Sequence, residues 1–169
     1  MAAASGSNPN PEKDPPSTSL SQPELSSRSR PQVLVVEDSK ADAVLIRQAM
    51  KTASLEADAH FVEDGHKAMQ FFDTADSDSS APCPDLVLLD LNLPKKSGVE
   101  VLAHLRNSRT CNRAAVLIVT SSDSIRDREA VAALGATDYF RKPSTYPDFL
   151  KLGAIMKDLL ERERRSGDK

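Results

Sequence analysis

Acidic side chains follow two apolar runs of the sequence. Glu37 and Asp38 come directly after the run 33–36, and Asp90 comes directly after the run 86–89. If these runs are neighbouring strands of one parallel sheet, the carboxylates meet at the carboxyl edge, where open α/β sheets bind their ligands. Repulsion between bare carboxylates is costly at short range, and a hard cation relieves it while leaving water positions open for a phosphoryl group. These acids therefore predict a site for Mg2+.

A hydroxyl and an ammonium group are expected at the same edge. Thr120 ends another apolar run, and Lys142 follows the last strand candidate, directly before Pro143. Together with the acids they supply what phosphoryl transfer needs for positioning and charge neutralisation. Singly, each acid could be a helix cap or a first-turn charge, Thr120 a cap and Lys142 a surface lysine. The combination favours phosphoryl chemistry.

Strands and helices that alternate along the chain must position these groups. The apolar runs 33–36, 86–89 and 115–119 are typical of central strands, and 57–62 and 138–140 suit sheet edges. Helix faces are indicated by Ala41, Val44, Leu45 and Ala49; by Ala68, Met69 and Phe72; by Val101, Leu102 and Leu105; by Val131 and Leu134; and by Phe149, Leu152, Met156, Leu159 and Leu160. This order predicts an α/β fold, a doubly wound five-stranded parallel sheet with strand order 2-1-3-4-5.

The amino-terminal segment differs from the rest of the chain. Residues 1–30 are rich in Ser, Pro, Ala and Asn, and we predict a disordered tail because they cannot bury enough surface to offset ordering entropy. A docking segment is the alternative. The folded domain is expected over 31–165, with a flexible carboxyl terminus at 166–169. The acidic, Ser-rich stretch 73–84 is interpreted as a solvated connector, and a partner-specific surface is the alternative.

Composition limits the possible partners. The chain has 169 residues, 39% of them hydrophobic, which suits one domain. A net charge of −3 and a pI near 5.6 argue against binding nucleic acid or an anionic membrane, so protein partners are expected. Neither a membrane-spanning run nor a secretory signal is found, which predicts a cytoplasmic protein. Cys83 and Cys111 show no metal-ligand spacing and are interpreted as thiols of a reducing compartment.

Four segments of the sequence resemble the receiver domain of two-component response regulators. The resemblance extends from about residue 32 to about residue 160. The sequence around Asp90 and the run 142–149 are most similar to stand-alone receivers that partner bacterial phytochrome-type histidine kinases. The four segments are Val35-Val36-Glu37-Asp38, Leu88-Leu89-Asp90-Leu91-Asn92-Leu93-Pro94-Lys95-Lys96-Ser97-Gly98, Val119-Thr120-Ser121-Ser122 and Tyr139-Phe140-Arg141-Lys142-Pro143. The resemblance implies a flavodoxin-like fold.

The resemblance also implies a role for each matched residue at the sheet edge. Asp90 would be the nucleophile that takes a phosphoryl group from a kinase phosphohistidine and forms an acyl phosphate. Asp38, Asp90 and the backbone carbonyl of Asn92 would bind Mg2+ directly, and Glu37 directly or through water. Lys142 would pair with a phosphoryl oxygen. Receivers more commonly carry two aspartates where this chain has Glu37 and Asp38.

A switch is implied as well. Thr120 would donate its hydroxyl to the phosphoryl group only after modification, and Tyr139 would turn toward the space that Thr120 vacates. The face formed by the fourth helix, the fifth strand and the fifth helix would then change. The Lys142–Pro143 peptide bond is expected to be cis.

The implied protein is a phosphoacceptor that catalyses its own phosphorylation and dephosphorylation, not an enzyme for other substrates. Its partners would be a sensor histidine kinase, with the phytochrome type as one candidate, and a downstream protein or a histidine phosphotransfer protein. A homodimer could also form. No DNA-binding or catalytic output module is expected after the fifth helix.

Two other protein classes would also use a doubly wound sheet. A haloacid-dehalogenase-like phosphohydrolase needs a second acid two residues after its nucleophile, and Asn92 stands there. A flavodoxin-like cofactor protein would need a phosphate-cradling loop after the first strand, where Glu37 and Asp38 would repel phosphate.

Overall fold

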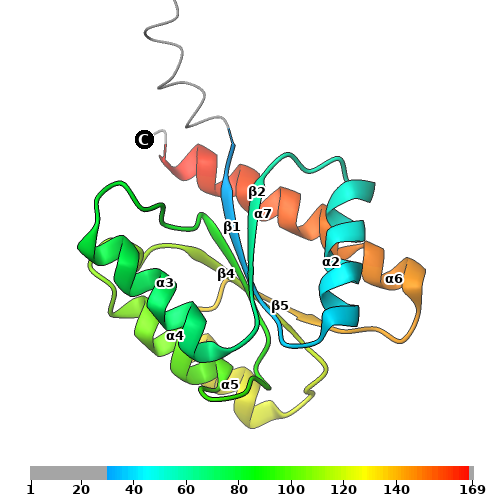
Figure 1. Cartoon of the computed structure of the whole chain (residues 1–169). Helices are drawn as coiled ribbons and strands as arrows, with labels where there is room; N and C mark the ends of the chain where they lie inside the picture. The colour runs from blue at the N-terminus through cyan, green and yellow to red at the C-terminus, as the bar shows by residue number, and fades with distance from the viewer. Residues whose placement is uncertain (1–29, 168–169) are drawn as a thin grey trace, which may run out of the picture. The chain divides into compact units, whose positions relative to one another are not determined.

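A single parallel sheet organises the chain. The computed structural model describes residues 30–167, so nearly all of the predicted tail 1–30 lies outside the described residues. The strands are β1 (Gln32–Val36), β2 (Asp58–Val62), β3 (Leu86–Leu89), β4 (Ala115–Thr120) and β5 (Asp138–Arg141). All pairs are parallel and the order is β2-β1-β3-β4-β5, which confirms the predicted topology (Figure 1).

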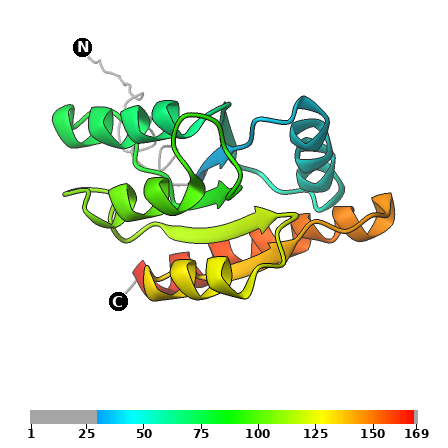
Figure 2. The ribbon, with the colours of Figure 1, turned by 90° about the horizontal axis from the view of Figure 1, so that it is seen from below.

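Helices cover both faces of the sheet. The helices are α2 (Lys40–Thr52), α3 (Gly65–Ser77), α4 (Gly98–Arg106), α5 (Ile125–Ala133), α6 (Tyr146–Leu150) and α7 (Leu152–Gly167). Helices α3, α4 and α5 lie on one face, and α2, α6 and α7 lie on the other (Figures 1 and 2). The fold is therefore the doubly wound three-layer arrangement expected from alternating strands and helices.

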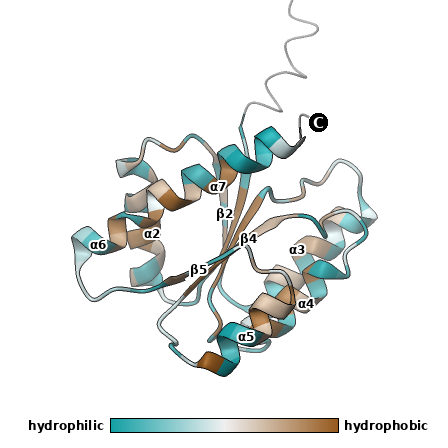
Figure 3. Cartoon of the chain, turned by 180° about the vertical axis from the view of Figure 1, so that it is seen from behind, coloured by the Kyte–Doolittle hydropathy of each residue, from teal (hydrophilic) through white to brown (hydrophobic). Residues whose placement is uncertain are grey.

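The central strands are buried on both faces. Leu34 and Val36 pack toward α3, α4 and α5, whereas Val33 and Val35 pack toward α2 and α7, as the period-two geometry of a strand requires. Apolar residues accordingly follow the strands and the inner faces of the helices, with polar residues outside (Figure 3).

One predicted helix face and some predicted helix limits were wrong. Val44 was expected on the inner face of α2 but is 55% exposed, and the buried residues there are Ile46, Ala49 and Met50. The last predicted helix is two helices, α6 and α7, that meet at Lys151. Helix α3 continues to Ser77, so the connector predicted over 73–84 is shorter.

The carboxyl-terminal prediction is only partly covered by the structure. Helix α7 runs to Gly167, past the predicted domain end at residue 165. Residues 168–169 lie outside the described part of the chain. No helix among residues 30–167 is long and apolar enough to cross a membrane.

The interpretation of the cysteines as free thiols was wrong. Cys83 and Cys111 form a disulfide, with their Cα atoms 5.3 Å apart. They lie in the loops that lead into β3 and β4, and because these strands are neighbours the two loops are brought together. Spacing along the sequence does not reveal such a contact. The disulfide also removes the argument that these cysteines indicate a reducing compartment.

The expected cis peptide was also wrong. No described residue has a cis peptide bond, so Lys142–Pro143 is trans, the form that X–Pro bonds favour. The Lys142 backbone is instead held by its N–H, which donates to the carbonyl oxygen of Thr120 (2.8 Å).

Candidate functional site

The predicted acids meet where β1 and β3 end. Val36 and Leu89 are paired in register, so Glu37 and Asp90 leave their strands side by side. Carboxylate oxygens of Glu37, Asp38 and Asp90 all lie within 4.8 Å of one another. Glu37 and Asp90 are each only 6% exposed, whereas Asp38 faces solvent.

Lys142 reaches into this cluster from the end of β5. Its Nζ donates to Glu37 Oε2 (2.7 Å) and to Asp90 Oδ2 (3.0 Å). It also donates to Asp42 Oδ2 (2.7 Å), on the first turn of α2. The side chain of Lys142 is 11% exposed, so these ion pairs are largely shielded from water. The structure brings Lys142 together with Glu37 and Asp90, and Asp42 is an addition that the sequence did not indicate.

For both Glu37 and Lys142, burial and the neighbouring charges shift the pKa in opposite directions. Burial raises the pKa of Glu37 to about 7, although the Lys142 ammonium and the Ser39 N–H lower it. Burial alone would lower the pKa of Lys142, but its bonds to Asp42 and Glu37 and the charge of Asp90 outweigh burial and raise the pKa.

The donor set fits a hard divalent cation. One ammonium group faces the carboxylates of Glu37, Asp42 and Asp90, with Asp38 beside them, so negative charge is in excess. Carboxylate oxygens are the ligands that Mg2+ prefers, and a cation at this position would favour the ionised form of Glu37.

The loop after β3 fixes the carboxylate of Asp90. The Asn92 N–H donates to Asp90 Oδ1 (3.1 Å), so both oxygens of Asp90 are hydrogen-bonded, Oδ2 to Lys142. A side chain on Gly98, at the start of α4, would collide with the backbone carbonyl oxygen of Asp90. Glycine is therefore required for α4 to begin this close to the acid.

Thr120 and Tyr139 both contact Ser122. Thr120 is fully buried, and its Oγ1 accepts a hydrogen bond from the Ser122 N–H (3.3 Å). The Tyr139 hydroxyl donates to the Ser122 carbonyl oxygen (2.8 Å). The Tyr139 side chain therefore lies against the loop after β4. Ser122 was not singled out from the sequence, because a serine between a strand and a helix is also common as an ordinary helix N-cap.

Comparison with known proteins identifies the family. The family model described as "Response regulator receiver domain" matches residues 33–152. The chain belongs to the response regulator receiver family. Response regulator Rcp1 of Synechocystis sp. strain PCC 6803 is 37% identical to this receiver over 120 residues, which are 71% of this chain and 82% of Rcp1.

Solved structures extend the comparison. The Mn(2+)-bound form of Rcp1 matches with a TM-score of 0.70 and 36% identity, over 78% of this chain and 95% of that one. The phosphorylated cyanobacterial phytochrome response regulator RcpA matches with a TM-score of 0.71 and 32% identity, over 78% and 94%. This chain is thus a receiver of two-component signalling, and its acidic cluster fits Mg2+ binding. Receivers are phosphoacceptors and not classical enzymes.

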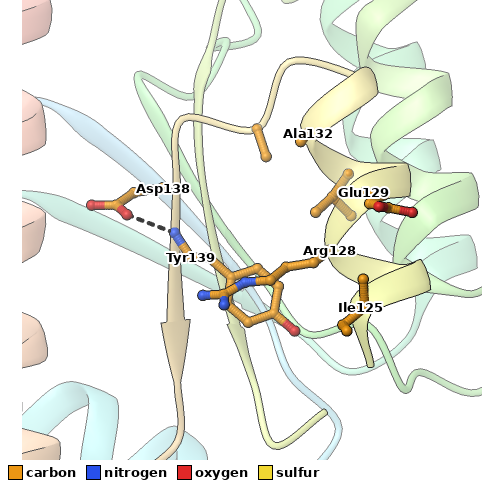
Figure 4. Close-up of a pocket in the computed structure, with 8 residues that line it drawn as sticks. Ile125, Arg128, Glu129, Ala132, Asp138 and Tyr139 are labelled. Atoms are coloured by element: carbon orange, nitrogen blue, oxygen red, sulfur yellow. Dashed lines mark hydrogen bonds between the residues drawn. The ribbon is translucent and has the colours of Figure 1, made fainter. Parts of the chain in front are cut away.

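A pocket of about 410 Å³ lies beside Tyr139 in this receiver (Figure 4). It lies between α5 and β5, and the Arg128 guanidinium carbon is 4.4 Å from the centre of the Tyr139 ring. The residues that Figure 4 labels around it are Ile125, Arg128, Glu129, Ala132, Asp138 and Tyr139. Ile125 is 73% exposed, so the rim of the pocket is partly apolar.

Proposed function

We propose that Asp90 of this receiver accepts a phosphoryl group from a sensor histidine kinase. The observation that carries the proposal is the position of the buried Asp90 carboxylate, 3.0 Å from Lys142 Nζ and within 4.8 Å of Glu37 and Asp38. These are the groups that phosphoryl transfer needs, namely a nucleophile, a fixed cation and a metal site.

The transfer step is a displacement at phosphorus. An oxygen of Asp90 forms a bond to phosphorus as the bond from phosphorus to the histidine nitrogen breaks, and the electron pair leaves with the imidazole. Lys142 holds one oxygen of Asp90 and supplies positive charge for the phosphoryl oxygens. The Asn92 N–H holds the other oxygen of Asp90, so the carboxylate enters the reaction already oriented.

Glu37, Asp38, Asp90 and the carbonyl of Asn92 would hold Mg2+. Mg2+ bound by these residues would supply charge neutralisation between the incoming phosphoryl group and the carboxylates. The two buried acids and the exposed Asp38 support this assignment, because together they offer hard oxygen ligands with one side open to water.

Thr120 and Tyr139 form the switch of this proposal. When the Thr120 hydroxyl donates to the phosphoryl group, the loop at Ser122 is pulled inward and the hydrogen bond from Tyr139 to Ser122 is exchanged. The readout surface is the pocket between α5 and β5, which is part of the predicted face.

The proposed partners follow from the relatives. RcpA is by its description a phytochrome response regulator, which supports a phytochrome-type histidine kinase as the donor. A downstream protein or a histidine phosphotransfer protein would read the switch, and a homodimer could form. The phosphohydrolase alternative has no support, because Asn92 stands where the second acid is needed and its N–H binds Asp90.

Labelling with a small phosphodonor tests the acceptor. Incubation with acetyl phosphate and Mg2+ should add one phosphoryl group to the intact protein, and Asp90→Asn should abolish this because an amide is not the nucleophile. Asp123→Asn is the matched control, since Asp123 is an exposed acid in the loop after β4. Full, acid-stable labelling of Asp90→Asn would refute the assignment, and repeated turnover of donor without bound phosphate would favour a phosphatase.

A further inference from the structure

Asp42 uses its carboxylate differently from the corresponding acid of α4. In α4 the Glu100 side chain accepts from the backbone N–H of its own N-cap residue (3.0 Å), which completes a capping box. In α2 the backbone N–H of the N-cap Ser39 donates to Glu37 Oε1 instead (3.0 Å). The Asp42 carboxylate is thereby left to accept from Lys142 Nζ at 2.7 Å. The first turn of α2 therefore offers its acid to the functional site.

The ammonium group of Lys142 has to be positioned over a long reach. Lys142 follows β5, whereas Glu37 and Asp42 come after β1, and β3 and β4 lie between these two strands. Because Nζ ends a flexible four-carbon chain, its position depends on what its three N–H groups bind. The three acceptors are Glu37, Asp42 and Asp90, at 2.7, 2.7 and 3.0 Å. Three carboxylates therefore share the task of fixing Nζ.

The ligands of the site alter two of these three acceptors. Asp90 is no longer a charged carboxylate once it carries a phosphoryl group, and the N–H that it accepted then passes to a phosphoryl oxygen. Glu37 belongs to the cluster of acids that could hold a cation, so it would share its charge with a bound Mg2+. Asp42 is neither the phosphoacceptor nor one of the clustered acids. Its bond to Lys142 is therefore the one that both ligands leave unchanged.

We propose that Asp42 is a positioning residue, which holds Lys142 Nζ beside Asp90 both before and after phosphorylation. The inference rests on the proposed roles of Asp90 and Lys142. Burial supports it, because the side chains of Lys142 and Asp42 are only 11% and 28% exposed, so the bond between them is largely shielded from water. Without this bond the ammonium group would be freer to move, and fewer molecules would have it aimed at the phosphoryl group.

Two variants separate the hydrogen bond of Asp42 from its charge. Asp42→Asn and Asp42→Ala both remove the negative charge, but only asparagine keeps an oxygen that can accept from Lys142. Both keep the backbone N–H that donates to the N-cap Ser39 (3.2 Å), so α2 should still form. At saturating Mg2+ and acetyl phosphate, Asp42→Asn should be labelled about threefold to tenfold faster than Asp42→Ala. Equal rates would overturn the proposal.

Matched controls show whether Asp42 acts through Lys142. Asp148 also stands third in its helix, α6, but its carboxylate accepts from the hydroxyl of its own N-cap Thr145 (2.8 Å). Asp148→Asn and Asp148→Ala should therefore be labelled at the same rate. In the Lys142→Met background, the difference between Asp42→Asn and Asp42→Ala should vanish, because the ammonium group that they position is gone. A difference that persists without Lys142 would refute the proposed role.

The ammonium signal of Lys142 gives a readout that does not depend on the rate of transfer. In the full chain with beryllofluoride and Mg2+, the Nζ protons should exchange with water slowly enough to be observed by NMR, in the unmodified sequence and in Asp42→Asn. The signal should disappear in Asp42→Ala, because water then reaches one N–H group. An equally sharp signal in Asp42→Ala would contradict the proposal, as would its absence from the unmodified sequence.

Failure of the proposed function would give a different result. The unmodified protein would then take no phosphoryl group from acetyl phosphate at any Mg2+ concentration, which overturns both proposals. Labelling of Asp90 at equal rates in Asp42→Asn and Asp42→Ala overturns only the role of Asp42.

Discussion

The hydroxyl of Tyr139 donates to the carbonyl oxygen of Ser122, across the gap between β5 and the loop after β4. The N–H of that same serine donates to the Thr120 hydroxyl oxygen. The two proposed switch residues therefore hold one residue of the loop, Tyr139 through that residue's carbonyl oxygen and Thr120 through its N–H. Movement of either side chain therefore changes a hydrogen bond of Ser122, and this shared residue couples the two side chains.

Loss of the Thr120 hydroxyl should separate acceptance from response. Thr120→Val keeps the buried volume nearly unchanged, so Asp90 should still be labelled by acetyl phosphate, but the loop should no longer be drawn to the phosphoryl group. Amide shifts induced by beryllofluoride should then disappear at residues 121–145. The same distant shifts in Thr120→Val would show that the coupling runs elsewhere.

Tyr139→Phe should disturb the switch face while leaving the acceptor chemistry intact. The variant loses one hydrogen bond to Ser122, and we expect a stability loss of about 1 kcal/mol in urea unfolding. The rate of labelling at Asp90 should match that of the unmodified protein within about twofold, because the Tyr139 hydroxyl binds Ser122 and not the acids Glu37, Asp38 and Asp90. A large drop in labelling rate would place Tyr139 in the chemistry itself.

Asp38 should matter for the metal and little for the fold. Its side chain is exposed, so Asp38→Ala should leave the midpoint of thermal unfolding in chelator nearly unchanged. The variant should bind Mg2+ at least about tenfold more weakly and be labelled more slowly at limiting Mg2+, because one oxygen ligand is lost. Isothermal titration and mass spectrometry measure the two effects. Labelling that persists in excess chelator would contradict the metal site.

Asp76 should make stability depend on acid pH. Its carboxylate accepts from Thr110 Oγ1 (2.6 Å) and Ser108 Oγ (2.7 Å), and these bonds lower the pKa of Asp76 below its usual range. A lowered pKa in the folded state gives stability that is present above the unfolded-state pKa, near 4, and is lost as the pH falls below that value. Asp76→Asn should therefore destabilise the protein more at pH 7 than at pH 3.

Urea unfolding at the two pH values measures this difference. Asp158→Asn is the control, because Asp158 is an exposed acid on α7. Among residues 30–167 its ion pair is with Arg162. An equal loss of stability for Asp76→Asn at both pH values would contradict the role of its charge.

Reduction of the disulfide should lower stability. The bond closes a loop over 28 residues of sequence separation, for which chain entropy predicts about 3 to 4 kcal/mol of stabilisation. Unfolding with and without a dithiol reductant measures the change, and Cys83→Ala should be insensitive to the reductant. Two thiols titrated in the unfolded, unreduced protein would show that the bond is not formed.

The sheet and the meeting of its acids could be predicted because both follow from simple rules. Apolar runs mark buried parallel strands, and parallel strands end at one edge, which brings Glu37 and Asp90 together. The break at Lys151 could not be predicted, because one apolar face continues from Phe149 to Leu160 across it. Asp42 was overlooked because an acid three residues after a serine already has a local explanation as a helix start.

The disulfide lies at the opposite edge of the sheet from Asp90, where β3 and β4 begin. Its loss should therefore change how much of the receiver is folded, and leave the geometry around Asp90 unaltered. In a signalling circuit, these are separate quantities. The folded fraction sets how much receiver can take part in a response, whereas the geometry around Asp90 sets the rate constants of phosphorylation. Oxidation of Cys83 and Cys111 would therefore change the size of the response and leave its rate unchanged.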